Sequence, residues 1–242
     1  MEPANLTTMV VLYTTQVRLD TNQLAYHLPL TDRVIKVEKQ GVIKRGTSRK
    51  DQVRHRVVAA PPKRTTGFGH NSITIVVLSR GDGNRREKEI TVKIFQNGVF
   101  HITGVVDETY DRDVMCYLRS HINRYCTEAI REGEWEPEVR RVVLMNYKTK
   151  IRDVTNLSRE RLSANLRRLG LKTNYEPAVY PAVKVYFPDK KWIAKIFRTG
   201  NVILTGMTAE EECQELTKTL NEVLETALET TPYDSHGSSI RV

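Results

Sequence analysis

Four acids in the segment DETYDRD have the most obvious capacity for chemistry in this sequence: Asp107, Glu108, Asp111 and Asp113. Clustered carboxylates of this kind bind the divalent cations of metal-dependent nucleases. The same segment stands where a helix is predicted to begin, and acids at that position are stabilised by the helix dipole. We therefore expect the four acids to start a helix, and a nuclease is the catalytic alternative.

Other catalytic patterns are absent from the sequence. Cys116, Cys126 and Cys213 lack the paired spacing of a disulfide framework or a zinc site. The segment RGDGNRRE at 80–87 lacks the spaced oxygen ligands of a calcium loop, and it is predicted to be a hairpin loop. The sequence has no glycine-rich phosphate loop and no serine nucleophile elbow. We expect a protein without catalytic activity and without a cofactor.

The charge of the chain is strongly basic, with a net charge of +9 and a pI near 9.5. Residues 33–64 hold 11 Lys or Arg against Glu38 and Asp51. Such an excess favours nucleic acid or an anionic membrane surface as a partner, and the alternative is a charged loop that only keeps the protein soluble. This basic stretch could be a disordered arm, an extra DNA contact or a docking site for another protein. The longest early apolar run, 9–13, is too short to span a membrane, so we expect a soluble intracellular protein.

The sequence contains one pattern twice. KIFQNGVFHITG at 93–104 reads as a β-hairpin, and KIFRTGNVILTG stands at 195–206. Five residues recur 102 positions later: Ile94, Phe95, Gly98, Thr103 and Gly104 match Ile196, Phe197, Gly200, Thr205 and Gly206. The chain is therefore predicted to consist of two related halves.

Each half is predicted to run as strand, helix, strands, hairpin and closing helix. The opening strands, 10–18 and 143–152, align at an offset of 134, so the first half carries 32 extra residues, mostly in the basic stretch. The domain prediction is a first repeat at 1–133, a second repeat at 134–230 and a polar tail at 231–242. The basic insertion is placed at about 33–66.

The closing helices are predicted to cover one face of a sheet. In the second half, Thr208 with Glu211 fits a capping box. An apolar stripe follows it, made of Cys213, Leu216, Leu220, Val223, Leu224 and Ala227. The first half offers the shorter stripe Val114, Leu118 and Ile122. The other sheet face must then meet water or a partner.

Side chains alternate along a strand, so parity decides which residues lie on that uncovered face. If Val202 and Leu204 pack under the helix, their neighbours point away from it. The second half then presents Asn146, Lys148, Ile193, Lys195, Phe197, Asn201, Ile203 and Thr205. The first half presents Leu12, Thr14, Lys93, Phe95, Val99, His101 and Thr103. This mixture of apolar, hydroxyl and cationic residues has no carboxylate.

Such a surface suits the minor groove of DNA. The groove floor offers mainly hydrogen-bond acceptors and sugar edges, and its walls carry phosphate. Hydroxyls and Asn reach the floor, apolar residues press on sugars, and Lys meets phosphate. The alternative is that a partner chain or the basic insertion covers this face.

These residues resemble the TATA-binding protein family. The family pattern I-F-x-x-G-x-x-x-x-T-G stands here as IFQNGVFHITG and IFRTGNVILTG, and YEPAVYP at 175–181 is similar to its Y-E-P-x-x-F-P. The resemblance implies an α+β saddle, in which two pseudo-repeats form one curved antiparallel sheet with helices on its convex face. The divergence and the insertion are more similar to members encoded by large DNA viruses than to cellular ones.

The resemblance also implies the roles of individual residues. Aromatic side chains would wedge between base steps: Tyr180 and Phe197 in the second half and Phe95 in the first, whose partner falls near Ser72 or Phe68. Floor contacts map to Asn146, Ile203, Thr205, His101 and Thr103. Implied partners are A·T-rich double-stranded DNA, a transcription-factor-IIB-like protein and a multisubunit RNA polymerase, in a nucleus or a cytoplasmic viral factory. A homodimer of the free protein that hides the sheet is left open.

Departures from the family pattern predict weaker base selectivity. Leu12 stands where the family places an Asn, and Lys148, Lys93 and Lys195 replace apolar residues. These changes shift binding toward phosphate and relax the preference for A·T pairs. His101 could add a mild pH dependence, and the alternative is an exposed strand histidine without such a role. The rival interpretation is a non-catalytic interaction module whose concave face binds a protein or itself.

Overall fold

The computed structural model describes residues 1–53 and 71–229, which divide into two compact units. The N-terminal unit is Thr8–Val143, and the C-terminal unit combines Met1–Thr7 with Leu144–Val242. Phe68 and the predicted tail at 231–242 lie outside the described residues. The repeat boundary between 133 and 134 stays a prediction.

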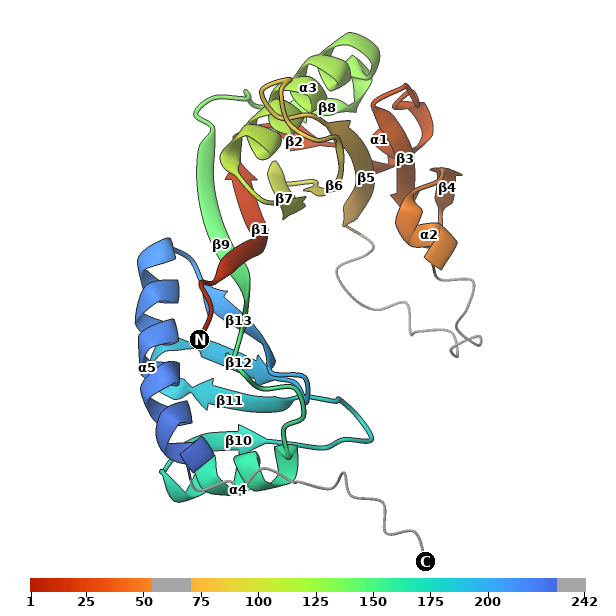
Figure 1. Ribbon diagram of the computed structural model, residues 1–242. Coiled ribbons are helices and arrows are strands. Elements are labelled where there is room, and N and C mark those ends of the chain that lie inside the picture. Colours follow the sequence, from red (N-terminus) through yellow and green to blue (C-terminus); the bar gives the residue numbers. More distant parts are fainter. Residues whose placement is uncertain (54–70, 230–242) are drawn as a thin grey trace, which may run out of the picture. The chain divides into compact units, whose positions relative to one another are not determined.

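The N-terminal unit is built on an antiparallel sheet with the strand order β1-β7-β6-β5-β3-β4 (Figure 1). Its strands are β1 (Asn5–Thr14), β2 (Arg18–Leu19), β3 (Val34–Lys39), β4 (Ile43–Gly46), β5 (Ser72–Ser79), β6 (Lys88–Phe95), β7 (Val99–Val105) and β8 (Ile130–Glu132). Its helices are α1 (Thr21–His27), α2 (Arg49–Val53), α3 (Glu108–Tyr125) and the 3₁₀ turn η2 (Thr127–Ala129). Strands β2 and β8 form a separate two-stranded sheet.

The C-terminal unit repeats this plan without the additional β4 and α2. Its strand order is β9-β13-β12-β11-β10, again antiparallel. The elements are β9 (Val139–Lys150), α4 (Arg159–Arg168), β10 (Lys172–Asn174), β11 (Val183–Phe187), η3 (Pro188–Lys190), β12 (Trp192–Ile196), β13 (Asn201–Met207) and α5 (Glu210–Glu229). Figure 1 shows α5 running across these strands, with α4 beside β10.

Strand alternation and the helix stripes meet in one core in each unit. In the C-terminal unit, Val202 and Leu204 are fully buried together with Leu216 and Leu220 of α5. In the N-terminal unit the fully buried residues include Val92, Ile94, Phe100, Ile102, Val114, Leu118 and Ile122. The predicted α+β class is therefore confirmed. Among the described helices, none is long and apolar enough to cross a membrane.

The recurring glycines of the two hairpins have a backbone reason. Gly98 and Gly200 have φ of 77° and 79°, a region that residues with a Cβ rarely adopt. Each donates its backbone N–H to the carbonyl of the Phe three residues earlier, Phe95 or Phe197, over 3.2 and 3.0 Å. A Cβ on Gly98 would also lie 2.4 Å from the carbonyl oxygen of Val17. The repeated pattern therefore encodes the same tight turn twice.

Both closing helices begin at the predicted places, with one change of partner. The Asp107 carboxylate caps α3 by accepting the backbone N–H of Thr109 at 3.0 Å. At α5 the carboxylate that reaches back is that of Glu212, not the predicted Glu211, and it accepts the backbone N–H of Thr208 at 2.6 Å. Residues 80–87 connect β5 to β6, which confirms the predicted hairpin loop.

Within the N-terminal unit, the buried carboxylate of Asp111 ties α3 to β1 and to the first residues of β9, which lie in this unit. The Asp111 side chain of α3 is fully buried and accepts two bonds from the guanidinium of Arg140 on β9, at 2.6 and 3.1 Å. It also accepts the hydroxyl of Tyr13 on β1 at 2.7 Å. Burial first, and then this bond, raises the pKa of Tyr13. The hydroxyl is therefore a permanent donor.

We predict that Asp111→Ala lowers the free energy of unfolding by about 3 kcal/mol, because the half-buried guanidinium of Arg140 and the buried hydroxyl of Tyr13 lose their acceptor. Urea unfolding at neutral pH measures the change. The control is Asp82→Ala in the exposed 80–87 loop, which should cost less than about 0.5 kcal/mol. Equal losses in the two variants would contradict a stabilising role for the Asp111 network.

Candidate nucleic-acid interface

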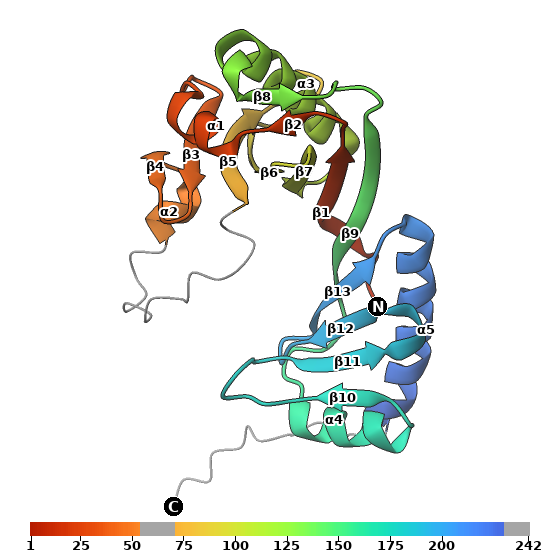
Figure 2. The same ribbon diagram turned by 180° about the vertical axis from the view of Figure 1, so that it is seen from behind.

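Each unit presents a sheet face on the side opposite its core. We call these the N-terminal and the C-terminal outer face. In the C-terminal unit α4 and α5 contact the sheet, and residues of alternate parity to the core remain half-buried or exposed. Figure 2 shows the same strands from behind. The predicted site residues that lie on strands have this outward parity, so the parity argument from the sequence is confirmed for them.

The C-terminal outer face carries a transverse row of cations. Lys148, Ile203, Lys195 and Lys184 are direct strand partners across β9, β13, β12 and β11. Lys150 and Lys172 have the same parity on β9 and β10. The next row holds Asn146, Thr205, Ile193 and Tyr186. Neither row contains a carboxylate, so the face has a positive potential and offers hydrogen bonds.

Two predicted wedge residues come together at the end of this face. Tyr180 lies in the β10–β11 connection and Phe197 directly follows β12, yet their rings meet edge to face with centroids 6.0 Å apart. The ammonium of Lys184 lies 5.1 Å from the Tyr180 ring centroid. Both rings are half-buried. The arrangement is a paired aromatic surface beside cations.

A hollow of about 460 Å³ adjoins the Phe197 ring. The hollow is lined by Lys148, Arg159, Pro181, Phe197, Arg198, Thr199, Asn201 and Ile203. Two of these residues, Arg159 and Arg198, are arginines that were not predicted as site residues. The guanidinium of Arg159 donates to the carbonyl of Pro181, and that of Arg198 donates to Asn156. The hollow therefore joins an apolar wall to cations.

The N-terminal outer face repeats the pattern with fewer charges. Leu12, His101, Lys93 and Thr74 are partners across β1, β7, β6 and β5. Val10, Thr103, Thr91 and Val76 form the next row. Phe95 ends β6 and is half-buried, and Thr14 ends β1 and is exposed. All predicted N-terminal site residues therefore share this face.

The strand pairing corrects the alignment of the two opening strands. Asn146 pairs with Thr205, and Val10 pairs with the equivalent Thr103. The counterpart of Asn146 is therefore Val10, at an offset of 136, and not the predicted Leu12. Leu12 corresponds to Lys148. The error of two residues kept the parity, so no residue changed its face.

The same register excludes Ser72 as the first-half counterpart of Tyr180. Val183 pairs with Ile196 as Ile73 pairs with Ile94, so Ser72 corresponds to Ala182. The counterpart of Tyr180 falls at position 70, which lies outside the described residues. Ser72 itself is buried.

The acids of the 107–113 segment do not form a metal site. Asp111 is bound by Arg140 and Tyr13. Asp113 accepts bonds from Arg33 at 2.6 Å and from Ser79 at 2.5 Å. No group of three potential metal ligands exists among residues 1–53 and 71–229. The expectation that these acids begin a helix is confirmed.

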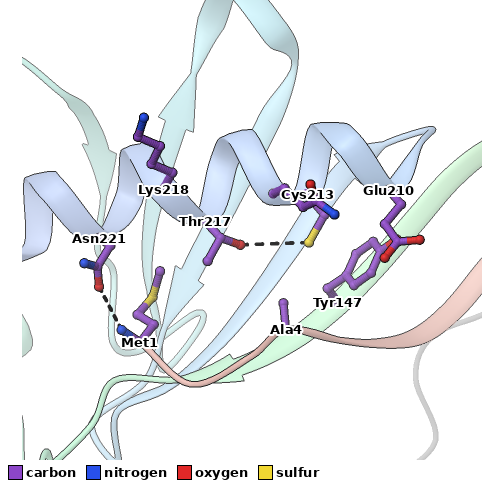
Figure 3. Close-up of a pocket in the computed structure, with 9 residues that line it drawn as sticks. Met1, Ala4, Tyr147, Glu210, Cys213, Thr217, Lys218 and Asn221 are labelled. Carbon is purple, nitrogen blue, oxygen red and sulfur yellow. Dashed lines mark hydrogen bonds between the residues drawn. The ribbon is translucent and has the colours of Figure 1, made fainter.

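A second pocket, of about 470 Å³, lies against α5 and has no predicted site residue (Figure 3). Its lining includes Tyr147, Cys213 and Thr217. The amino terminus of Met1 donates to Asn221 at 2.8 Å across one end of the pocket. Burial raises the pKa of Cys213, so this thiol is a poor nucleophile.

Several outer-face residues are not among those predicted from the sequence: Val10, Thr74, Thr91, Lys150, Lys172, Lys184 and Tyr186. The sequence does contain a signal for Lys184 and Tyr186, because they alternate with the apolar Val183 and Val185, which are buried on β11. Arg159 and Arg198 gave no signal, because they reach the hollow from a helix and a turn.

Comparison with known proteins matches residues 148–227 to the family described as transcription factor TFIID (or TATA-binding protein, TBP). A TATA-box-binding protein of Methanocaldococcus jannaschii is 26% identical over 173 residues, covering 65% of this chain and 93% of that protein. TATA-box-binding protein 2 of Methanosarcina acetivorans is 27% identical over 123 residues, covering 50% of this chain and 62% of that protein. The solved structure of Methanococcus jannaschii TBP shares the fold, with a TM-score of 0.58 and 15% identity over 93% of this chain and 99% of that one. The predicted TBP-like fold is confirmed.

The titration of His101 follows from its position on the N-terminal outer face. Burial first, and then the neighbouring Lys93, lowers the pKa of His101 below its ordinary value. The imidazole is therefore neutral at pH 7. On acidification the unfolded chain takes up the proton before the folded one, so folding stability is lost as the pH falls below about 6.5.

We predict that wild type loses more stability than His101→Gln between pH 7.5 and pH 5.5, because the variant lacks this proton uptake. Urea unfolding at both pH values gives the comparison. Asn22→Ala, which changes an exposed helix residue that does not titrate, should behave as wild type. If His101→Gln loses as much stability as wild type, His101 is not the titrating group.

Proposed function

Because sequence similarity and fold together support a protein of the TATA-binding protein family, we propose that this chain is a non-catalytic transcription initiation factor that binds DNA through its outer faces. The target is the minor groove of A·T-rich promoter DNA, which the protein bends. The observation that carries the proposal is the C-terminal outer face. It presents a paired Tyr180–Phe197 surface beside a row of lysines.

The residues divide into three roles on the proposed duplex. Phe197, Tyr180 and Phe95 insert between base steps and unstack them, at a cost on the order of a few kcal/mol per step. The floor of the groove is contacted by Asn146, Ile203, Thr205, His101, Thr103 and Thr14. Lys148, Lys195 and Lys93 meet the phosphates at its walls, and counterion release then favours binding.

The cation row supports a relaxed sequence preference. Phosphate contacts position a protein on a duplex but carry no base information. The row contains three lysines, Lys148, Lys195 and Lys184, and two of them, Lys148 and Lys195, stand where the family pattern has apolar residues. We propose that A·T preference is weaker than in other family members.

The partners and the location follow from family membership. We propose a transcription-factor-IIB-like protein and a multisubunit RNA polymerase as partners on the promoter. The location is a nucleus or, for a virus-encoded member, a cytoplasmic viral factory. A homodimer that covers the outer faces in the absence of DNA is compatible with this scheme.

The alternative function is a protein-interaction module of TBP fold. One observation favours it: α2 of the chain itself already lies against the N-terminal outer face, as its contacts with β6 show. An outer face that accepts one protein segment offers the chemistry to accept another. A protein of this second class would bind neither A·T-rich nor G·C-rich duplexes at low salt.

We predict that Phe197→Ala reduces DNA bending more than affinity, because the wedge acts on the unstacked step and the phosphate contacts remain. Gel shift gives the affinity and circular-permutation mobility gives the bend on an A·T-rich duplex. Tyr26→Ala, which removes an aromatic that is 52% exposed on α1, is the matched control. An unchanged bend in Phe197→Ala would contradict the wedge role.

We predict that Lys195→Ala weakens binding to A·T-rich and G·C-rich duplexes alike and lowers the slope of log K against log salt by about 0.9. The physical reason is the loss of one phosphate contact with its released counterion. Lys218→Ala, an exposed lysine on α5, should leave the slope unchanged. A selective loss on A·T-rich DNA would instead assign Lys195 to base recognition.

A further inference from the structure

Helix α2 of the insertion lies on the N-terminal outer face, on the sheet side opposite the core. The backbone N–H of Arg49 donates to the carboxylate of Glu89 at 3.1 Å, and the ammonium of Lys50 donates to the hydroxyl of Thr91 at 3.3 Å. Glu89 and Thr91 belong to β6. Figures 1 and 2 both show α2 beside β3 and β4, away from α1 and α3.

Asp51 is the centre of the attachment. Its carboxylate accepts bonds from Lys36 of β3 and Lys44 of β4, both at 3.0 Å. It also accepts the backbone N–H and the hydroxyl of Ser48, at 2.9 and 3.0 Å. Burial alone would raise the pKa of Asp51, but the bonds from Lys44, Ser48 and Lys36 hold that pKa well below its usual range. The carboxylate is therefore charged at any physiological pH.

Comparison of equivalent strands shows how much of the outer face α2 covers. Lys36 pairs with Val76 as Lys172 pairs with Tyr186 in the C-terminal unit, so the two lysines are equivalent. Lys36 is only 6% exposed, whereas Lys172 is exposed. Val76 is 4% exposed, whereas Tyr186 is half-buried. In the N-terminal unit the insertion therefore covers the positions of Lys36 and Val76, whose equivalents Lys172 and Tyr186 are accessible in the C-terminal unit.

The cover is polar and reaches a predicted DNA contact. A cavity of about 570 Å³ lies beside these contacts, and its lining includes Lys36, Lys50, Asp51, Thr74, Thr91 and Lys93. Five residues are too few for a helix that is stable by itself in water. Of the two ion pairs of Asp51, the one with Lys44 is half-exposed and contributes little, whereas the one with Lys36 is largely buried. Lys36 keeps its pair with Glu38 when Asp51 leaves, so its charge is not left without a carboxylate. The attachment is therefore specific but weak enough to exchange for a charged partner.

We propose that α2 is an intramolecular cover of the N-terminal outer face, released when that face takes up duplex DNA. The proposal rests on the proposed function. The Thr91 hydroxyl and the surface around Lys93 contact either α2 or the duplex, but not both at once. Asp51 holds the cover in place, and the phosphates of the duplex compete with its carboxylate for Lys36 and Lys44.

The test compares Asp51→Ala with Asp82→Ala, because both remove one negative charge from the N-terminal unit. Amide hydrogen exchange of residues 49–53 reports the cover without DNA. Titration with an A·T-rich duplex gives the affinity. We expect Asp51→Ala to exchange faster at α2 and to bind the duplex about fivefold more tightly than Asp82→Ala. Saturating wild type with duplex should also speed exchange at α2.

Three results would overturn the cover. They are weaker duplex binding by Asp51→Ala than by Asp82→Ala, equal affinities for these two variants, and exchange at α2 that stays slow in duplex-saturated wild type. Each of them leaves the proposed function intact, because the duplex is bound. Absence of binding by all three proteins would overturn the proposed function, and the competition would fall with it.

Discussion

The two-residue period of an antiparallel strand is the constraint on which the rest of this structure depends. Because Val202 and Leu204 pack under α5, the side chains of Ile203 and Thr205 must point to the opposite face of the sheet. The same holds for Ile102 and its neighbours under α3. Each unit therefore has one covered face and one face left for a partner, and the core fixes which residues serve that partner.

Two units with one plan have come to present different outer faces. The C-terminal face is open among the described residues and carries the row Lys148, Lys195 and Lys184, whereas the N-terminal face is partly covered by α2. The described cations of the basic insertion bind partners within the protein. Arg45 donates to the carbonyls of Ala25 and Leu28 at the end of α1, and Lys36 pairs with Asp51. A high positive charge in a sequence is therefore no measure of the charge left for DNA.

Much of the candidate site was predictable, because local rules and tertiary packing agree there. Gly98 and Gly200 adopt a positive φ, which identifies the hairpin turns in the sequence. The apolar stripe of α5 needs a sheet face to pack on, so the side chains of Phe197 and Thr205 are predicted to point to the opposite face. Register was less certain, because strands shifted by two residues have the same alternation. The sequence alone therefore aligns Leu12 with Asn146, whereas the strand pairing makes Val10 the counterpart of Asn146.

The sequence by itself determined the duplication, the α+β class and the outward parity of the site residues, because these depend on spacing along one chain. Tertiary structure alone decided which distant groups meet: Asp111 with Arg140, Tyr180 with Phe197, and α2 with β6. Such contacts depend on how the chain returns in space. A charged side chain such as Lys36 has the same sequence signature whether it is buried against a carboxylate or free to meet a phosphate.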